Sequence, residues 1–344
     1  MKDARLRALV LSAGFGTRLR PLTYSLPKPL LPVCGEPVAG HTLRALRRIG
    51  CESAVLNTHY LAEQVPASLG KSHYGLPLRY SFEEEIQGTY GALFGPRRHL
   101  AEADAVLMLN GDSLCRWPLA ALVRRHVKEK ADLTLLLHRR APQDALGGGI
   151  GIAEDGRVVQ FRDYSARGEA HGRHIFAGAH VLSPALLERI ENRPGDIIED
   201  LYQPLLEEGA KIMTVVMAGL WHDLGTPGRY LKAHLDWARG RLPRTFWKGA
   251  VVSKLARLAG VTKLSRSVID EADIGAGASI VGSHIMDGAR VGKGCRIENS
   301  LVGPGVVLAD ASNVENRMIT RLDKKHELGP GESVMGGLIY TPLS

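Results

Sequence analysis

Two cations flank a glycine-rich turn near the start of the sequence. The stretch VLSAGFGTRLRPLTYSLPKPLLPV, residues 10–33, passes from an apolar run into a turn that contains Gly14 and Gly16, and it then supplies Arg18 and Lys28. Glycines let backbone N–H groups approach an anion closely, and arginine and lysine add full positive charge. The combination predicts a loop that binds phosphate groups.

The loop matches neither of the two common phosphate-binding loops. In GFGTRL, Leu19 stands where the dinucleotide fingerprint requires its third glycine, and no Gly-Lys-Ser/Thr follows as a Walker loop would need. A plain tight turn with surface cations would explain the loop if it stood alone. Other motifs are therefore needed to decide between these interpretations.

Two aspartates further along the chain also suit phosphate chemistry. Asp112 ends the run AVLMLNGD, and Asp223 lies in WHDLGTPGRYLKAH. Carboxylate oxygens are ligands that Mg²⁺ prefers, but Asp112 could also be a turn residue and Asp223 a helix cap. His222 is a possible acid or base, although a packed or exposed histidine is the commoner case.

Strand-like and helix-like patterns alternate over the first 240 residues or so. LRALVL at 6–11 is a short apolar run, and PVAGHTLRALRRIG has apolar spacing near 3.6 and ends at Gly50. SAVLNT, LRYSFE and AVLMLNGD are further strand-like runs. The alternation predicts an α/β domain with a mainly parallel sheet, covered on both faces by helices, that binds ligands beyond the carboxyl ends of its strands.

The pattern changes after about residue 240. From Val268 onward, apolar residues recur at steps of six or five, at 268, 274, 280, 285, 291, 297, 302 and 308, with glycines shortly after several of them. This hexapeptide period is typical of a β-solenoid, here a short left-handed β-helix of two to three coils. We therefore expect a first domain at 1–240, a linker at 241–265 and the β-helix at 266–344.

Composition limits the possible classes of protein. A length of 344 residues suggests two domains, and the net charge of +8 comes without a long basic run or basic residues interleaved with aromatic ones, so no nucleic-acid partner is expected. No stretch of about 18 apolar residues occurs, which argues against a membrane partner. Cys34, Cys51, Cys115 and Cys295 form no CxxC pair, so we expect reduced, mostly buried thiols in a soluble, cytoplasmic protein.

Five motifs occur in an order that resembles the sugar-phosphate nucleotidyltransferases. They are LSAGFGTRLRPLT with PKPLLPV, then EEEIQGTYGAL, LNGD, FAGAHVLSP and WHDLGTPG. The resemblance covers residues 5–240, and a hexapeptide-repeat tail is a common attachment in this family. It implies a Rossmann-like, glycosyltransferase-A-like domain that joins a nucleoside triphosphate to a sugar 1-phosphate and releases pyrophosphate.

The resemblance also implies roles for particular residues. Arg18 would stabilise the triphosphate and Lys28 the charge near the α-phosphate, while Asp112 and Asp223 would hold Mg²⁺ as the cofactor. No general base is required, because the phosphate monoester is already a nucleophile and the rate comes from positioning and electrostatics. The nucleotide-binding residues implied are Leu11, Ser12, Ala13, Gly14, Gly16, Thr17, Gly88, Thr89 and Gly111.

The sugar side departs from the family pattern. Many members carry an F-x-E-K-P segment whose lysine meets the sugar phosphate. The corresponding stretch here, QFRDYSARG, places Asp163 and Tyr164 where glutamate and lysine would be. Arg162 or Arg167 could replace the missing lysine.

Other sugar-side segments keep part of the pattern. The N-A-G segment of many members is FAG here, so the asparagine is lost and Gly178 remains. The glycines of GGGIG at 147–151 could line the sugar pocket or form a hairpin, and Trp221 could be a platform for the sugar or a core residue. The sugar-phosphate-binding residues implied are Gly149, Asp163, Gly178 and Trp221.

The resemblance ranks the substrates without deciding among them. Mannose 1-phosphate with GTP is the first choice, followed by glucose 1-phosphate with UTP or dTTP and then by an N-acetylated amino sugar 1-phosphate. The tail is expected to stabilise the first domain or to form contacts in a homo-oligomer.

Two other classes compete with an active transferase. A non-catalytic sensor of sugar nucleotides would be expected to have lost Arg18, Lys28 or one of the aspartates, and none is lost. An acyltransferase in the solenoid would need a catalytic histidine, and the array offers only His284.

Overall fold

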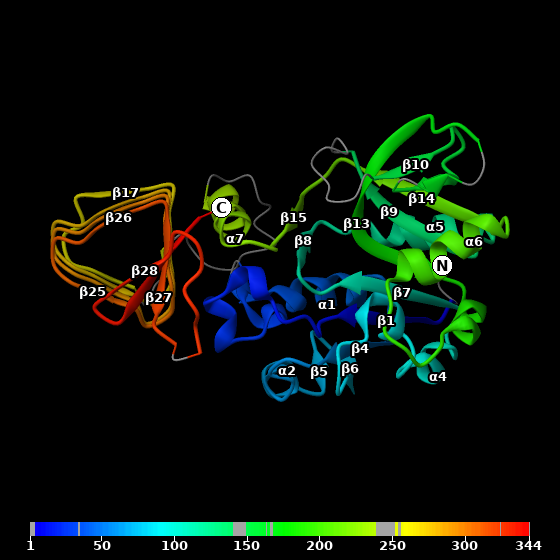
Figure 1. Cartoon of the computed structure of the whole chain (residues 1–344), viewed down its shortest axis with the longest axis horizontal. Coiled ribbons are helices and arrows are strands. Elements are labelled where there is room, and N and C mark those ends of the chain that lie inside the picture. The colour runs from blue at the N-terminus through cyan, green and yellow to red at the C-terminus, as the bar shows by residue number, and fades with distance from the viewer. Residues whose placement is uncertain are drawn as a thin grey trace. The chain divides into compact units, whose positions relative to one another are not determined.

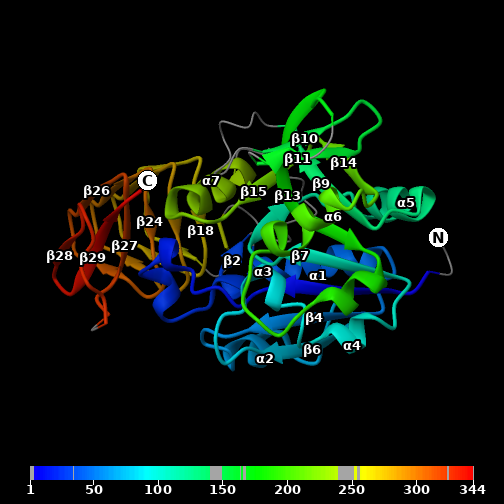
Figure 2. The ribbon, with the colours of Figure 1, turned by 45° about the vertical axis from the view of Figure 1, so that its right-hand side comes forward.

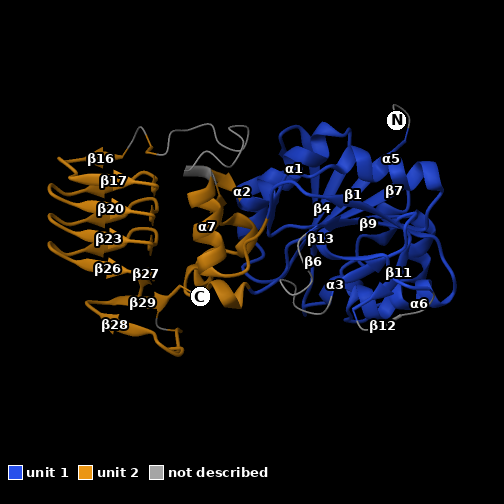
Figure 3. Ribbon diagram, turned by 90° about the horizontal axis from the view of Figure 1, so that it is seen from above, with its two compact units in different colours: residues 1–15, 38–221 blue, residues 16–37, 222–344 orange. Residues whose placement is uncertain are grey.

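The chain divides into two compact units. The computed structural model describes residues 4–33, 35–139, 149–162, 164–165, 168–238, 252–253, 256–323 and 325–343 (Figure 1). Unit 1 comprises Met1–Phe15 and Val38–Trp221, and unit 2 comprises Gly16–Pro37 and His222–Ser344 (Figure 3). The phosphate-binding loop and the segment after Trp221 therefore pack with the solenoid, whereas the sequence placed both in the first domain.

An eleven-stranded mixed sheet forms the centre of unit 1. Its main path runs in the order β12-β11-β10-β13-β7-β1-β4-β6-β5, and β9 joins β13 to β14. The parallel pairs β1–β4, β1–β7, β4–β6 and β9–β14 link β1 (Leu6–Leu11), β4 (Ser53–Thr58), β6 (Leu76–Phe82), β7 (Ala105–Asn110), β9 (Leu133–His138) and β14 (Ile212–Met217). This mainly parallel sheet confirms the predicted fold class.

Antiparallel strands extend the sheet beyond this parallel part. The long strand β13 (Gly172–Leu182) pairs antiparallel with β7, β9 and β10. The shorter strands of the sheet are β5 (Ser72–His73), β10 (Ile150–Ile152), β11 (Val158–Phe161) and β12 (Tyr164–Ser165), whereas β8 (Ser113–Cys115) and β15 (Trp221–Asp223) belong to a separate two-stranded sheet. Because β10 begins at Ile150, the second half of GGGIG is strand, while residues 147 and 148 lie outside the described residues.

Helices pack on this sheet through apolar faces. The helix α1 (Val38–Arg48) lies against β1 and β6, and α5 (Leu119–Glu129) lies against β9 and β14 (Figure 2). Shorter helices are α2 (Gln64–Leu69), α3 (Gly88–Gly91), α4 (Arg97–Leu100), α6 (Gln203–Glu207), a 3₁₀ helix at Pro184–Arg189 and a π-helix at Ile198–Tyr202. Burial of such faces supplies most of the stability of helices this short.

Unit 2 begins with the loop that the sequence predicts to bind phosphate, called the phosphate-binding loop below. The loop consists of three 3₁₀ turns at Thr17–Leu19, Leu22–Tyr24 and Lys28–Leu30, followed by β2 (Pro32–Val33) and β3 (Glu36–Pro37). The hydroxyl of Tyr230, on α7 (Pro227–Ala238), donates a hydrogen bond to the Pro32 carbonyl, and the ring of Tyr24 meets that of His326 edge-on at 5.4 Å. These contacts explain why the loop groups with unit 2.

Parallel strands stack into three sheets in the C-terminal solenoid. The sheets are β16-β19-β22-β25, β17-β20-β23-β26 and β18-β21-β24-β27, each with four parallel rungs. The strands are β16 (Arg257–Leu258), β17 (Lys263–Ser265), β18 (Val268–Ile269), β19 (Asp273–Ile274), β20 (Ser279–Val281), β21 (His284–Ile285), β22 (Arg290–Val291), β23 (Arg296–Glu298), β24 (Leu301–Val302), β25 (Val307–Leu308), β26 (Asn313–Glu315) and β27 (Arg317–Arg321). An antiparallel hairpin of β28 (Ser333–Met335) and β29 (Leu338–Pro342) extends the third sheet (Figure 3).

The solenoid is longer than the sequence predicted. It has four rungs, where the hexapeptide pattern indicated two to three, and its first strands lie within the segment 241–265 that was assigned to a linker. The first rung was missed because both residues of β16 are exposed and β17 reads Lys-Leu-Ser, so neither shows the apolar period. The prediction of a β-helix is confirmed, and its length is corrected.

Apolar side chains fill the interior of the solenoid. The residues at the predicted hexapeptide positions are buried, among them Ile274, Ile280, Ile285, Val291, Ile297 and Val302. Each side chain packs on its counterparts in the rungs above and below, as in other repeat proteins. The period read from the sequence therefore identifies this core correctly.

Three cysteines are buried free thiols, as expected. They are Cys51, Cys115 and Cys295, while Cys34 lies outside the described residues. Burial raises the pKa of Cys51 to about 12, so this thiol stays protonated. In the part of the chain that the structure describes, no helix is long and apolar enough to cross a membrane.

Removing the Ile297 side chain tests the solenoid core. Ile297 is fully buried, and Ile297→Ala should lower the free energy of unfolding by about 2–5 kcal/mol, because a large-to-small core substitution loses burial and leaves a cavity. Urea unfolding followed by circular dichroism measures the change. The control Val307→Ala, at a position 56% exposed, should alter stability little, and equal effects of the two would contradict the assignment of the core.

Candidate active site

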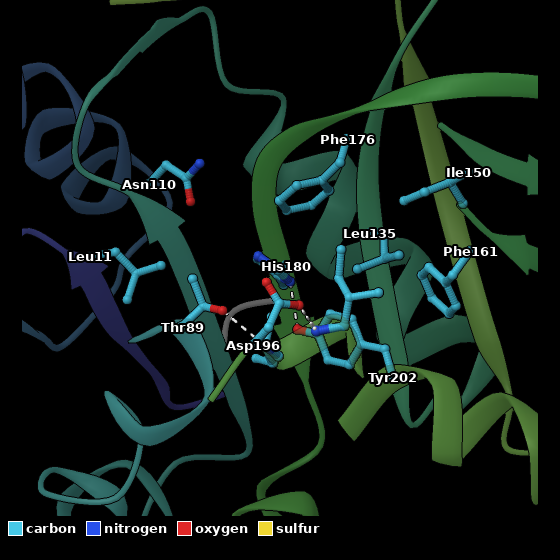
Figure 4. Close-up of a pocket in the computed structure, with 12 residues that line it drawn as sticks. Leu11, Thr89, Asn110, Leu135, Ile150, Phe161, Phe176, His180, Asp196 and Tyr202 are labelled. Carbon is cyan, nitrogen blue, oxygen red and sulfur yellow. Dashed lines mark hydrogen bonds between the residues drawn. The ribbon is translucent and has the colours of Figure 1, made fainter. Parts of the chain in front are cut away.

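A cavity in unit 1 collects residues from four of the five motif segments. It has a volume of about 160 Å³, and its lining includes Leu11, Thr89, Asn110 and Phe176 (Figure 4). These residues come from the LSAG, QGTYG, LNGD and FAG segments in turn. Residues far apart in the sequence thus meet at one place, which was predicted only in general terms from the strand ends.

The first wall of the cavity is formed where β1 and β7 end side by side. Leu11 pairs with Asn110 in the parallel register, and the Gly111 N–H donates to the Leu11 carbonyl at 2.9 Å. A Cβ on Gly111 would lie 2.6 Å from that carbonyl oxygen, so the position requires glycine. Asp112 follows directly, at the carboxyl end of the strand where the sequence placed it.

A chain of buried hydrogen bonds connects the phosphate-loop strand with the QGTYG segment. The Ser12 N–H donates to Asn57 Oδ1 at 2.7 Å, and Asn57 Nδ2 donates to Glu83 Oε1 at 2.8 Å. The second oxygen of Glu83 accepts from the Gln87 N–H at 3.0 Å. Asn57 and Glu83 therefore fix the spacing of two motif segments.

Sequence reasoning missed Asn57 and Glu83. Both are buried, with exposures of 3% and 7%, although neither is an apolar residue. The available signal was their position, because each stands at the carboxyl end of a predicted strand, SAVLNT or LRYSFE, where ligand sites of parallel sheets form.

The glycine of the QGTYG segment is explained by packing on the loop before the π-helix. Gly88 has φ +68°, and a Cβ there would lie 2.3 Å from the Gly195 carbonyl oxygen. The Tyr90 N–H donates to the same oxygen at 3.0 Å, and the Thr89 hydroxyl accepts from the Ile197 N–H at 2.9 Å. The expected nucleotide contacts of Gly88 and Thr89 remain a prediction.

The far wall of the cavity is mainly aromatic. The Tyr202 hydroxyl and His180 Nδ1 share a hydrogen bond of 2.5 Å, and the Phe176 ring meets the His180 ring edge-on at 4.4 Å (Figure 4). Burial lowers the pKa of His180 to about 3 and raises that of Tyr202 well above its usual value. Both groups therefore stay neutral near pH 7, and the carboxylate of Asp196 is the charged group of the lining.

Residues expected on the sugar side are only partly brought together. Gly178 has φ +85° at an irregularity of β13, and a Cβ there would lie 3.0 Å from Asn110 Nδ2, so it supports a side chain that lines the cavity. Gly149 lies directly before β10. Trp221 stacks on His138 with ring centroids 5.7 Å apart and does not belong to the lining.

The region of the missing lysine is described only in part. Asp163 and Arg167 lie outside the described residues, and so does the side chain of Tyr164. Arg162 forms ion pairs with Glu199 at 2.9 Å and with Asp196 at 3.8 Å. To serve as a substitute cation, Arg162 would have to give up these carboxylates.

Charged residues gather at Gly225 in unit 2. A Cβ on Gly225 would lie 2.8 Å from Asp223 Oδ1 and 3.0 Å from Arg18 Nη2, so the predicted metal ligand and the predicted triphosphate cation converge there. The other oxygen of Asp223 accepts a hydrogen bond from Arg229. Lys28 is buried within its 3₁₀ turn, with 9% exposure.

The turn itself is held by a small set of contacts. The Thr23 hydroxyl donates to the Gly16 carbonyl at 2.8 Å, and a Cβ on Gly16, which has φ +64°, would lie 2.9 Å from Thr23 Cγ2. At Gly14, by contrast, an added Cβ would have no atom of the described residues within 4 Å. Packing explains the glycine at 16 but not the one at 14, where a close approach of ligand to backbone remains the better reason.

Comparison with known proteins decides the family. A family model described as nucleotidyl transferase matches residues 7–240. The chain belongs to the nucleotidyl transferase family. This confirms the resemblance inferred from the motifs, and the match covers more than half of the chain.

Two relatives of this nucleotidyl transferase are named as mannose-1-phosphate guanylyltransferases. It is 34% identical over 296 residues to the mannose-1-phosphate guanylyltransferase of Mycobacterium tuberculosis, covering 82% of this chain and 80% of the relative. It is 31% identical over 229 residues to the mannose-1-phosphate guanylyltransferase catalytic subunit beta of Xenopus tropicalis, covering 66% of this chain. The match spans 63% of the length of that Xenopus relative.

A solved structure shares the fold of the nucleotidyl transferase. The crystal structure of HddC from Yersinia pseudotuberculosis aligns with a TM-score of 0.55 over 66% of this chain and 97% of that chain. The sequence identity is 23%, so the likeness concerns the fold alone.

Two histidines considered for catalysis are buried in unit 2. His222 Nε2 lies 3.6 Å from the Asp236 carboxylate, which makes it a packed histidine. His284 is fully buried, and its Nε2 lies 2.7 Å from Asp270 Oδ2. An acyltransferase histidine must reach its substrate, so the burial of His284 argues against such a site in the solenoid.

The variant Glu83→Gln tests the hydrogen-bond chain. Glutamine presents an NH₂ group to one of the two donors that Glu83 now accepts from, so a buried donor loses its partner. The free energy of unfolding should fall by about 1–3 kcal/mol. Chemical denaturation measures this, with the exposed Glu84→Gln as the matched control. A Glu83→Gln variant as stable as the control would show that the chain does not organise the site.

The pH dependence of stability tests whether His180 stays uncharged in the folded protein. Between pH 6.5, the usual pKa of histidine, and about 3, the unfolded chain binds a proton that His180 in the fold does not, so stability falls as the pH falls through this range. His126 and His234, whose pKa values burial lowers to about 4 and about 3, act in the same direction.

The variant His180→Gln isolates the contribution of one histidine. It should make the dependence of unfolding free energy on pH shallower by up to about 1.4 kcal/mol per pH unit, the value for one proton. Denaturation at a series of pH values measures the slope. The exposed His171→Gln is the control for replacing a histidine by glutamine, and an unchanged slope in His180→Gln would contradict the lowered pKa.

Proposed function

We propose that the chain transfers a nucleotidyl group from GTP to mannose 1-phosphate, giving GDP-mannose and pyrophosphate. The observation that carries the proposal is the cavity of unit 1, where residues of four motif segments meet. The names of the relatives at 31–34% identity support the choice of substrates. Glucose 1-phosphate with UTP or dTTP and an amino sugar 1-phosphate are the alternatives.

The sugar side of the proposal rests on the size and lining of the cavity. Its volume of about 160 Å³ is below the roughly 300–1,000 Å³ of sites for drug-sized ligands, which suits one sugar ring rather than a whole nucleotide. Asn110 and Asp196 supply polar groups, and Phe176 supplies an apolar surface. We place the acceptor sugar in this cavity, with Gly178 and Gly149 beside it, while the contacts expected of Asp163 and Trp221 remain unassigned.

The nucleotide side rests on the two cations and the turn. Transfer requires an oxygen of the sugar phosphate to bond to the α-phosphorus while the bond to the departing pyrophosphate breaks. Both reactants are anions, so their repulsion is the main obstacle. Arg18 would hold the triphosphate and Lys28 would stabilise charge near the α-phosphate, with backbone N–H groups from Ala13 to Thr17 completing the binding.

Mg²⁺ is proposed as the cofactor, held by Asp112 and Asp223. The donor set fits, because Mg²⁺ usually takes one or two protein carboxylates and fills its other positions with phosphate oxygens and water. Among the described residues there is no cluster of three or more His, Cys, Asp or Glu, so an all-protein metal cage is not offered. When bound, the ion would supply positive charge to the reacting phosphates.

A release assay tests the proposed function. Purified protein with Mg²⁺ is incubated with each common nucleoside triphosphate against a panel of hexose 1-phosphates, and pyrophosphate is measured. GTP with mannose 1-phosphate should give the highest kcat/KM. Asp112→Asn and Asp223→Asn should each lower kcat about a hundredfold, by analogy with loss of a preorganised donor.

The outcomes separate the competing classes. The exposed Glu154→Gln serves as the matched control and should retain full activity. Turnover that survives both aspartate substitutions would contradict the metal assignment. No release across the panel, with nucleotide still bound, would favour a non-catalytic sensor.

A further inference from the structure

We propose that unit 2 carries a second binding pocket, for a small phosphate-bearing metabolite, outside the proposed transfer site. A cavity of about 660 Å³ lies between the phosphate-binding loop and the C-terminal hairpin segment. Thr17, Arg20 and Tyr24 line it from the loop, and residues 325–332 and 341–342 contribute the opposite side. Thr17 also belongs to the turn proposed for the nucleotide, but the lining contains neither Arg18, Lys28 nor the two aspartates of the proposed reaction.

Arg20 lines this pocket, and one nitrogen of its guanidinium is buried without a partner in the part of the chain that the structure describes. Its Nε is buried and has no hydrogen-bond partner among the described residues, and the guanidinium carbon lies 5.0 Å from the centre of the Tyr24 ring. A buried donor without a partner costs free energy, which an anion in the pocket would recover. Stacking on the tyrosine also fixes the orientation of the guanidinium, so little freedom is lost on binding.

Lys325 supplies the second cation. It lies in the segment that leads from β27 to the hairpin of β28 and β29. It is exposed at the pocket, and its ammonium group forms no ion pair with the residues that the structure describes. An arginine and a lysine on opposite walls of one cavity are a suitable pair for a phosphate group, because arginine binds two oxygens at once and lysine binds as a point charge.

The acidic residues of the lining do not cancel these charges. Glu332 is enclosed by donors, since it accepts hydrogen bonds from the Gly329 N–H at 2.7 Å, the Thr341 hydroxyl at 2.6 Å and His326 Nε2 at 2.6 Å. These three donors therefore stabilise the negative charge of Glu332. Glu327 also lines the pocket, but it is exposed, so solvent screens its charge, and Arg20 and Lys325 are the groups that would attract an anion.

The size of the pocket indicates more than a bare phosphate ion. A volume of about 660 Å³ lies in the range of roughly 300–1,000 Å³ that holds drug-sized molecules. The Tyr24 ring, Pro330 and Pro342 offer apolar surface for an organic part of the ligand. A sugar phosphate and a nucleotide share this chemistry, and the experiment distinguishes them.

Equilibrium dialysis of the full chain tests the pocket. The probes are radiolabelled inorganic phosphate, a hexose 6-phosphate and a nucleoside monophosphate, used one at a time. Lys325→Gln and Arg20→Gln should each weaken binding of at least one probe tenfold or more, and Lys325→Arg should restore it. Lys293→Gln, an exposed lysine of the solenoid outside this lining, is the matched control and should bind as the unaltered chain does.

The result does not depend on the proposed transfer reaction. The dialysis contains neither nucleoside triphosphate nor Mg²⁺, and any phosphate held by Arg18 and Lys28 gives a background that Lys325→Gln leaves in place. If the hexose phosphate or the nucleotide binds more tightly than inorganic phosphate, and if this binding also depends on Lys325, the result would support the pocket and identify the organic part of its ligand. Equal binding of all three probes by the unaltered chain and by Lys325→Gln would overturn the proposal.

Discussion

The candidate site depends on one close approach of backbone to backbone. The Gly111 N–H bonds to the Leu11 carbonyl where β1 and β7 end, and no side chain fits between them. This contact fixes two motif segments at the same height of the sheet. Asn110 is thereby turned toward the cavity, and Asp112 follows at the strand end.

Burial of polar groups at this edge requires that each find a partner. Glu83 is held by donors from Asn57 and from the Gln87 backbone, and the buried His180 and Tyr202 share a hydrogen bond. The buried polar groups of unit 1 are thus paired with one another, and the Asp196 carboxylate is the charged group of the cavity lining.

Much of the fold and of the site could be predicted from the sequence, and the failures have physical reasons. The spacing of apolar residues predicted the parallel sheet and the β-helix, because burial of apolar faces is the main source of stability in both. It missed β16, whose two residues are exposed. The order of the motifs predicted Arg18 and Asp223 as site residues, and their side chains do lie together beside Gly225. Asn57 and Glu83 escaped prediction, because a buried polar residue is recognised only when its partners are known, and those lie on other strands.

The division of the chain has a consequence for how such proteins diversify. The polypeptide passes from one unit to the other after Phe15, after Pro37 and after Trp221, so the loop with the strongest family signature is structurally a part of the solenoid unit. The tail is therefore not an independent module that recombination could exchange at a single junction. A foreign C-terminal segment would arrive without His326, which the Tyr24 ring contacts, so the loop would have to be inherited together with it.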